Sequence, residues 1–295
     1  MDAELIVRCP AKLNLFLEVV RRRPDGYHDL DTVMQAIDLY DDLHIEPRPG
    51  PALTLECSDP SLPTDGRNLV IRAAQALRER AGCRGGAHLR LVKRIPSEAG
   101  LGGGSSDAAG AIAGLARAWR LGLSSAELAD VAAAVGSDVA FFLTGGAAHC
   151  TGRGERVEPL AVRAGFHAVL LCPPVGVSTA AAYRELRFPL TAIEINSTMM
   201  RRALGEGSLD ALGRCLFNRL EPPAFRLEPS LAEVKAQLAA SPLLAGALMT
   251  GSGSAIFGLC RPDDATRARE SAATLRAGPV CVVRSIDHGV RITRG

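Results

Sequence analysis

The sequence predicts a protein of mixed helices and strands that folds in two parts. Leu13, Leu15, Leu17 and Val19 fall on one face and Lys12, Asn14 and Glu18 on the other, which is the period of a β-strand. The alanine-rich stretch 106–121 is typical of a packed helix, and the pattern resets around residues 152–163. At 295 residues the chain is long enough for one large core or two ordinary ones.

Strands and helices follow one another through the first half. The strand that begins at Leu5 leads into a turn, because Pro24-Asp25-Gly26 is favourable turn chemistry. Ser124 and Glu127 have the spacing of a capping box, and Gly136 is typical of a helix end. In chain order we expect a strand from Leu5, extended regions over 32–37 and 42–46, a helix over 64–81, a strand over 87–94, and helices over 106–121 and 124–136.

The second half has the same mixture of elements. We expect the boundary near residue 158, which gives domains of residues 1–158 and 159–295. The apolar run 166–172 predicts a short buried strand. The remaining expected elements are helices near 180–186, 197–204 and 230–240, and strands over 255–260 and 280–286.

Composition and charge exclude several classes of protein. The formal net charge of +2 gives no field for wrapping nucleic acid. No stretch reaches the roughly 18 apolar residues that span a bilayer, and the N-terminus lacks the apolar segment of a signal peptide. The eight cysteines form no CxxC pair, which argues against a zinc site. We expect a protein of the reducing cytoplasm, with no nucleic-acid or membrane partner.

A glycine-rich loop is the strongest functional motif. Glycine lets the main chain approach a polyphosphate closely and point successive amides at it. Gly100, Gly102, Gly103 and Gly104 supply this freedom, and the helix that follows adds the positive end of its dipole. The predicted phosphate-binding residues are Pro96, Ser97, Glu98, Ala99, Gly100, Leu101, Gly102, Gly103, Gly104, Ser105 and Ser106, the two serines adding hydroxyl donors.

The loop differs from the common nucleotide-binding motifs. No lysine follows the glycines, so it is not a Walker A loop, and the GxGxxG spacing of dinucleotide-binding proteins and protein kinases is absent. A second glycine segment, Met249–Ala255, precedes an apolar strand. It either packs against the first loop, closes a substrate pocket or is a plain turn.

Phosphoryl transfer to an alcohol needs a group that takes the hydroxyl proton and cations that stabilise phosphate charge. Asp138 lies between a helix-ending glycine and an apolar run, which suits such a base and equally suits a helix N-cap. Lys12 lies mid-strand among apolar residues, where it requires an anionic partner unless it reaches solvent. Asp138 or the phosphates would serve as that partner.

With these residues the sequence resembles the superfamily of galactokinase, homoserine kinase and mevalonate kinase, over nearly the whole chain. The segments Arg23–His28 and Gln35–Asp41 resemble in particular the branch that phosphorylates a cytidine diphosphate derivative. The other matching segments are Pro10–Asn14, the glycine loop, Gly136–Asp138, Gly152–Glu155, Gly176–Thr179 and Thr250–Gly253.

The resemblance implies an α+β fold with two lobes. The N-terminal lobe would be ribosomal-protein-like, with a left-handed β-α-β unit that departs from the usual right-handed connection. The C-terminal lobe would be ferredoxin-like, and the active site would lie in the cleft between the lobes. The implied assembly is a monomer or a homodimer.

The resemblance also implies the reaction and its residues. The γ-phosphoryl group of ATP, with Mg²⁺, would pass to the 2-hydroxyl of 4-(cytidine 5'-diphospho)-2-C-methyl-D-erythritol in non-mevalonate isoprenoid synthesis. Asp138 would be the base, Lys12 its electrostatic partner, and Pro96–Ser106 the ATP site. The substrate side would be formed by Asn14, Tyr27, His28, Thr179 and Tyr183, with the two tyrosines stacking on cytosine. The Mg²⁺ ligand is left open between a loop serine and a shell of phosphate and water.

Three positions depart from the pattern of the resembling family. Ala140 stands where proline is common, Cys150 where glycine is common, and Arg219 where an acidic residue is usual. None of them changes Lys12 or Asp138. Two alternatives remain: a kinase of the same fold that acts on another small alcohol, such as homoserine or mevalonate, and a non-catalytic nucleotide-binding regulator.

Overall fold

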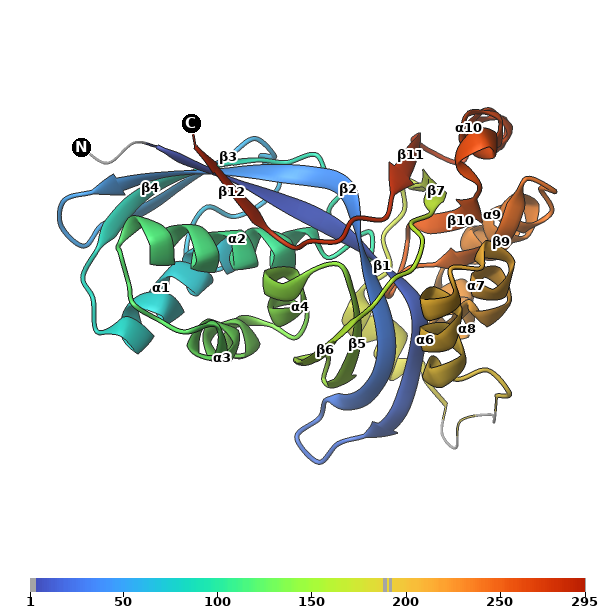
Figure 1. Ribbon diagram of the computed structural model, residues 1–295, viewed down its shortest axis with the longest axis horizontal. Coiled ribbons are helices and arrows are strands. Elements are labelled where there is room, and N and C mark those ends of the chain that lie inside the picture. The colour runs from blue at the N-terminus through green and yellow to red at the C-terminus, as the bar shows by residue number, and fades with distance from the viewer. Residues whose placement is uncertain (1–3, 188–189, 191–192, 295) are drawn as a thin grey trace.

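The computed structural model describes residues 4–187, 190 and 193–294 (Figure 1). The first three residues of the N-terminal segment lie outside this description. The first half of the chain contributes β1 (Leu5–Arg22), β2 (His28–Arg48), β3 (Leu53–Cys57), α1 (Leu69–Ala81), β4 (Gly86–Val92), α2 (Gly103–Ala118), α3 (Ser125–Val135), α4 (Val139–Thr144), β5 (Ala147–Gly152) and β6 (Arg156–Leu160).

The second half is built from shorter elements. They are β7 (His167–Leu171), α5 (Thr179–Arg184), α6 (Ser197–Glu206), α7 (Leu209–Cys215), β8 (Phe217–Asn218), α8 (Glu221–Leu227), α9 (Ser230–Ala239), β9 (Leu244–Met249), β10 (Ile256–Cys260), a 3-10 turn (Pro262–Asp264), α10 (Ala265–Ala273), β11 (Val280–Arg284) and β12 (Arg291–Arg294). The mixed class that the sequence predicts is confirmed.

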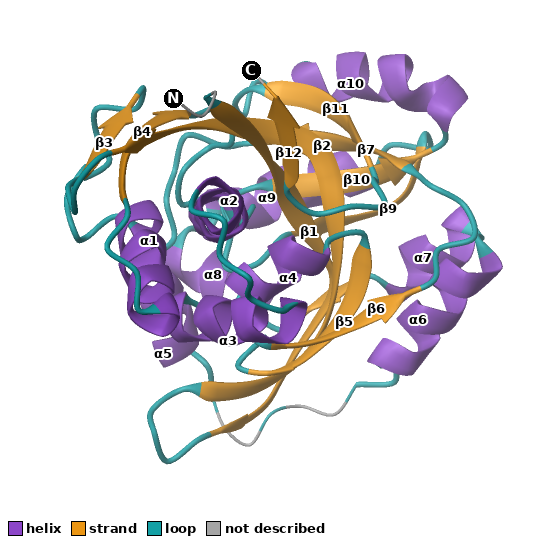
Figure 2. Ribbon diagram, turned by 60° about the vertical axis from the view of Figure 1, so that its left-hand side comes forward, coloured by secondary structure: helices purple, strands orange, loops and turns teal. Residues whose placement is uncertain are grey.

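Two sheets organise these elements. The larger sheet has the order β12-β1-β2-β4-β3, with β5 paired to β2, β6 to β5 and β8 to β1. The smaller sheet has the order β11-β7-β10-β9 and is antiparallel throughout. In Figures 1 and 2, α1, α2 and α3 lie on one side of the larger sheet, and the smaller sheet lies with α6–α10 at the other end of the molecule.

The long strands β1 and β2 run through both parts of the molecule (Figure 1). Val7 and Cys9 of β1 belong to the core under α2, whereas Leu13 and Leu15 belong to a second core shared with the smaller sheet. The β1–β2 register shifts at Pro10/Ala11 and again after Asn14. Such bulges redirect side chains, and here they flank Lys12 and Asn14.

Some helix boundaries agree with the sequence prediction and others differ from it. The capping box of Ser124 and Glu127 is present, and α3 ends at Gly136 as expected. Helix α1 begins at Leu69 rather than near residue 64, because Asn68 caps it by accepting a hydrogen bond from the amide of Val70. Helix α2 begins at Gly103, three residues earlier than predicted.

The division of the chain near residue 158 stays a proposal. That residue lies inside β6, which pairs with β5 of the larger sheet. The last strand, β12, returns from the second half to pair with β1. No helix among the described residues is both long enough and apolar enough to cross a membrane.

Candidate active site

A cavity of about 1350 Å³ is lined by residues from both halves of the chain. Its walls come from β1, the glycine loop, the start of α4, the β5–β6 turn, α5 and the turn after β9. Ligand pockets usually measure roughly 300–1,000 Å³. The cavity is therefore large enough for two ligands side by side.

The glycine loop forms one wall of the cavity and leads directly into α2. Gly100 and Gly102 have φ values of 76° and 73°, in the left-handed region that favours glycine. Gly103 and Gly104 instead form the first turn of α2, which has no side-chain cap and no acidic residue in its first turn. Its first amides are therefore open to an anion, and the helix dipole favours negative charge there.

The second glycine segment packs against the first. Ala255 donates its amide hydrogen to the Ala99 carbonyl at 3.1 Å, and the Thr250 hydroxyl contacts the Gly100 carbonyl at 3.4 Å. A Cβ atom at Gly100 would overlap the Thr250 carbonyl oxygen. The segment therefore packs against the phosphate loop, as one of the three interpretations expects, and its Gly251 and Ser252 also line the cavity.

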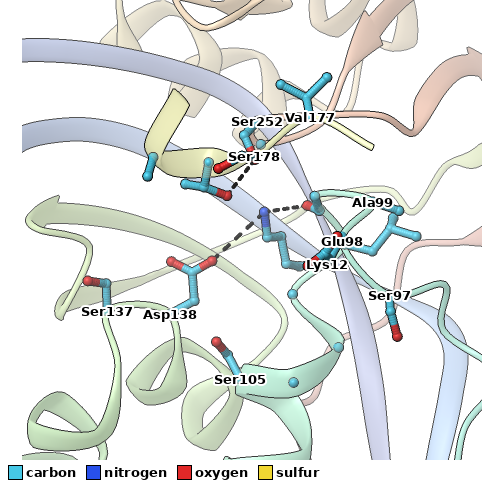
Figure 3. A pocket seen from close by; sticks show the side chains of 18 of the residues that line it. Lys12, Ser97, Glu98, Ala99, Ser105, Ser137, Asp138, Val177, Ser178 and Ser252 are labelled. Carbon is cyan, nitrogen blue, oxygen red and sulfur yellow. Dashed lines mark hydrogen bonds and ion pairs between the residues drawn. The ribbon is translucent and has the colours of Figure 1, made fainter. Parts of the chain in front are cut away.

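Lys12 and Asp138 face each other across the cavity (Figure 3). The Lys12 ammonium donates to Asn14 Oδ1 at 2.5 Å and to the Gly100 carbonyl at 2.7 Å. Its distance to Asp138 Oδ2 is 3.9 Å. The side chain of Asp138 is partly exposed and does not cap α4. Asp138 is thus free to meet a ligand, and the lysine has the anionic partner that its position requires.

Burial governs the acidity of the lysine. Lys12 is 3% exposed, and this loss of solvent lowers its pKa from the ordinary value of 10.5, while the charge of Asp138 opposes the decrease. The lysine is held among neutral acceptors and one carboxylate. Its charge is therefore supported chiefly by these contacts and by any phosphate that binds beside it.

Aromatic side chains form another part of the cavity wall. The rings of His28 and Tyr183 stack with centroids 4.9 Å apart. Burial raises the pKa of the Tyr183 phenol well above its usual range and lowers that of His28, so both groups are neutral near pH 7. Tyr27 is 53% exposed, and Arg153 lies 5.0 Å over its ring.

Small polar residues join the two halves of the chain beside the cavity. The Thr179 hydroxyl contacts the Ser252 hydroxyl at 2.8 Å. The backbone amide of Asn14 donates to the Thr250 hydroxyl at 3.0 Å. Asn14 also donates through its side chain to Thr32 at 3.0 Å, which orients its carboxamide oxygen toward Lys12.

The structure brings nearly all the predicted site residues to this cavity. The one that does not line it is Ser106, whose hydroxyl is fully buried and has no hydrogen-bond partner. The residues that do line it are Lys12, Asn14, Tyr27, His28, the ten loop residues 96–105, Asp138, Thr179 and Tyr183. Their roles stay proposals.

Sequence reasoning missed several residues of the cavity. Arg153 lines the cavity beside the Tyr27 ring, and only its glycine-rich surroundings in Gly152-Arg-Gly-Glu155 mark it in the sequence. Lys93 forms buried ion pairs with Asp41 and, at 2.8 Å, with Asp107 behind the start of α2. Burial raises the pKa of Asp107 to about 7. Lys93, Asp41 and Asp107 lie far apart in the sequence, so no local pattern reveals that they form ion pairs.

Oxygen donors of the cavity suit magnesium. Among the described residues no group of three or more His, Cys, Asp or Glu side chains could hold a metal ion by itself. The Ser105 hydroxyl and the Asp138 carboxylate both line the cavity near the loop (Figure 3). Mg²⁺ is usually held by one or two such groups together with substrate phosphates and water. The site therefore fits a Mg²⁺ ion that arrives with a nucleotide.

Comparison with known proteins identifies two family matches and similar sequences that are named as kinases. The sequence matches the GHMP kinases N terminal domain over residues 68–146 and the GHMP kinases C terminal family over residues 200–275. A 4-diphosphocytidyl-2-C-methyl-D-erythritol kinase of Pelotomaculum thermopropionicum is 44% identical over 90% of this chain and 92% of that protein. The kinase of the same name from Shouchella clausii is 40% identical over 86% of this chain and 84% of that protein.

Solved structures agree with the sequence relatives. A crystal structure of 4-(cytidine 5'-diphospho)-2C-methyl-D-erythritol kinase superposes with a TM-score of 0.78 at 39% identity, covering 95% of this chain and 99% of the other. A homoserine kinase from Cytophaga hutchinsonii superposes with a TM-score of 0.81 at 20% identity, over 99% and 98% of the two chains, and shows the shared fold alone. The chain has the α+β, two-lobed GHMP fold, and it belongs to the 4-diphosphocytidyl-2-C-methyl-D-erythritol kinase family of ATP-dependent GHMP kinases.

Proposed function

We propose that this protein transfers the γ-phosphoryl group of ATP to the 2-hydroxyl of 4-(cytidine 5'-diphospho)-2-C-methyl-D-erythritol. The observation that carries this proposal is the arrangement of one cavity. The glycine loop with the open start of α2, the stacked rings of His28 and Tyr183, and the pair of Lys12 and Asp138 all line this one cavity. The two relatives of the same printed name support the choice of substrate.

The chemistry follows from the placement of the charged groups. The substrate oxygen attacks the γ-phosphorus, the bond to ADP breaks, and the hydroxyl proton passes to the Asp138 carboxylate. Lys12 holds positive charge beside Asp138 and the Gly100 carbonyl, where the transferring group would lie. Mg²⁺, when bound, neutralises charge on the phosphates. The open amides at the start of α2 hold the donor in line.

The part of the cavity lined by aromatic residues suits a cytidine diphosphate. The stacked pair of His28 and Tyr183 offers a flat wall for a base, and Tyr27 stands at the rim. A diphosphate that joins the base to the reacting alcohol must pass between these rings and Asp138. Arg153, which lines the cavity beside the Tyr27 ring, supplies the cation that a diphosphate needs.

A panel of alcohols tests this function. The purified protein, ATP and Mg²⁺ are combined in turn with the cytidine-diphospho substrate, unsubstituted 2-C-methyl-D-erythritol, homoserine and mevalonate, and ADP release is measured. We expect turnover on the cytidine substrate alone. Clear turnover on another alcohol with none on the cytidine substrate would establish a kinase of different specificity. Nucleotide binding without turnover on any acceptor would favour a regulator.

A cytoplasmic location and a monomeric or homodimeric state are part of the same proposal. All eight cysteines are free thiols, which is usual in a reducing compartment. Size-exclusion chromatography with light scattering distinguishes the two assemblies.

A further inference from the structure

Asn218, at the end of β8, is a buried carboxamide that the reaction scheme does not use. It is 3% exposed. Its Nδ2 donates to the carbonyls of Met249 at 2.7 Å and Gly251 at 2.8 Å, and its Oδ1 accepts the amide hydrogen of Leu220 at 2.9 Å. The two hydrogen bonds therefore fix one short stretch of main chain, from the last residue of β9 into the turn Thr250–Ser254 that follows it.

This turn contacts three parts of the active site. Thr250 reaches the Gly100 carbonyl of the phosphate loop and accepts the amide hydrogen of Asn14. Gly251 approaches the Lys12 ammonium so closely that a Cβ atom there would lie 3.2 Å from Nζ. Ser252 contacts the hydroxyl of Thr179 on the substrate side.

The Gly100 carbonyl is the point where these contacts meet. It accepts a hydrogen bond from the Lys12 ammonium at 2.7 Å and lies 3.4 Å from the Thr250 hydroxyl. Movement of the turn would thus displace the phosphate loop and the lysine together. Displacements of about 1 Å in positioned groups can lower a rate by roughly a hundredfold.

We propose that Asn218 is a positioning residue for phosphoryl transfer, which acts by holding the turn Thr250–Ser254 against the phosphate loop and Lys12. The inference rests on the proposed function for its kinetic readout. It does not depend on which alcohol is the acceptor, because the turn contacts the ATP loop. Asn218 touches neither nucleotide nor substrate and is absent from the cavity lining.

The test replaces the carboxamide by an isosteric carboxylate. Asn218→Asp keeps the size of the side chain but turns both donors into an acceptor that faces two carbonyls. The matched control is Gln35→Glu. Gln35 is 1% exposed, and its Nε2 likewise donates to main-chain carbonyls, those of Ala36, Gly146 and Ile286. It does not line the cavity.

We expect Asn218→Asp to lower kcat at least tenfold and to weaken binding of a nonhydrolysable ATP analogue. Both are measured at a temperature where circular dichroism shows a folded protein. Gln35→Glu should lower the melting temperature but leave kcat and analogue affinity within about twofold of the unchanged protein. Asn218→Ser, which removes the Nδ2 group and leaves only a shorter hydroxyl without adding charge, repeats the comparison if the aspartate variant does not fold.

A second measurement shows whether Asn218 acts through the turn. Thr250→Val removes the hydroxyl that meets Gly100, and it is combined with Asn218→Ser. If the two residues act as one unit, the double variant loses about as much kcat as the worse single variant. If the fold-loss of kcat in the double variant equals the product of the two single losses, Asn218 acts elsewhere. Unchanged kcat and affinity in both Asn218 variants would overturn the inference.

The binding readout separates this inference from the proposed function. If the unchanged protein does not phosphorylate the cytidine substrate, that function fails, while the effect of Asn218 on analogue affinity still decides the inference. If the cytidine substrate is phosphorylated and the Asn218 variants behave like the Gln35 control, only the inference fails.

Discussion

The ammonium group of Lys12 is almost fully buried. Two of its contacts are neutral oxygens, those of Asn14 and Gly100, and the third is the carboxylate of Asp138. An ammonium in such a place loses its hydration, so its neutral form is favoured more than in water. The side chain that would balance the transferring phosphoryl group therefore loses its charge more readily as pH rises than an exposed lysine does.

The pH dependence of kcat should show this lowered pKa. As pH rises through the pKa of Lys12, the ammonium loses its proton and its support of phosphate charge disappears, so kcat falls. The fall should begin below lysine's ordinary value of 10.5. Lys12→Arg keeps its charge at these pH values, so its kcat, although lower, should not fall over the same range. A fall at the same pH in both proteins would show that another group titrates.

Asp138 should be needed for the chemical step and not for nucleotide binding. Asp138→Asn keeps the shape of the side chain but cannot take the hydroxyl proton. We expect kcat to fall roughly a hundredfold or more, because a positioned base contributes about 10²–10⁴. Affinity for an ATP analogue, measured by titration calorimetry, should change little. A normal turnover rate would remove Asp138 from its role, and Asp287→Asn, at an exposed site, is the control.

The phosphate loop and α2 act as a single element. Two glycines of the loop take left-handed backbone, while the next two already belong to the helix. The amides at the helix start and the turn before it thus face the cavity together. The rear of this element is held by the buried ion pairs of Lys93, and its outer side by the turn after β9.

Gly100 gives a direct test of this arrangement. In Gly100→Ala the new methyl group would meet the Thr250 carbonyl, so the loop must move away from its support. We expect the KM for ATP to rise about tenfold or more, with a smaller change in the KM for the alcohol. The matched control is Gly82→Ala at the end of α1, which also has positive φ but open space around it. An equal effect of both substitutions on the ATP KM would show that backbone strain alone is responsible.

The two parts of the molecule are interleaved and not strung in succession. β1 and β2 contribute to both cores, and β12 returns to the edge of β1. The cavity draws its walls from both halves. A chain arranged in this way should unfold as one cooperative unit.

Two probes can check that cooperativity. Trp119, the single tryptophan of the sequence, lies beside the first core, and its fluorescence reports on that part. Far-ultraviolet circular dichroism reports on the helices and strands of both. We expect the two thermal transitions to coincide. A circular dichroism change at a temperature where the fluorescence stays constant would show that the second part unfolds separately.

Local patterns in the sequence predict the elements that depend on near neighbours. The Ser124 capping box is such a case. So is the glycine loop, whose composition by itself predicts a phosphate-binding role. Asn218 and β12 could not be found in this way, because their importance lies in partners more than thirty residues away in the chain. Tyr183 was predicted to stack on a base, but its contact with His28 depends on how two distant segments meet.

The pairing of Leu5 with Arg294 has a consequence during protein synthesis. A ribosome releases β1 long before it makes β12, so the outer edge of β1 at residues 5–8 stays without its partner while the residues between the two strands are made. Open strand edges attract other chains. A nascent polypeptide that has not yet reached β12 therefore carries an open strand edge, and a product that lacks β12 would be prone to aggregate.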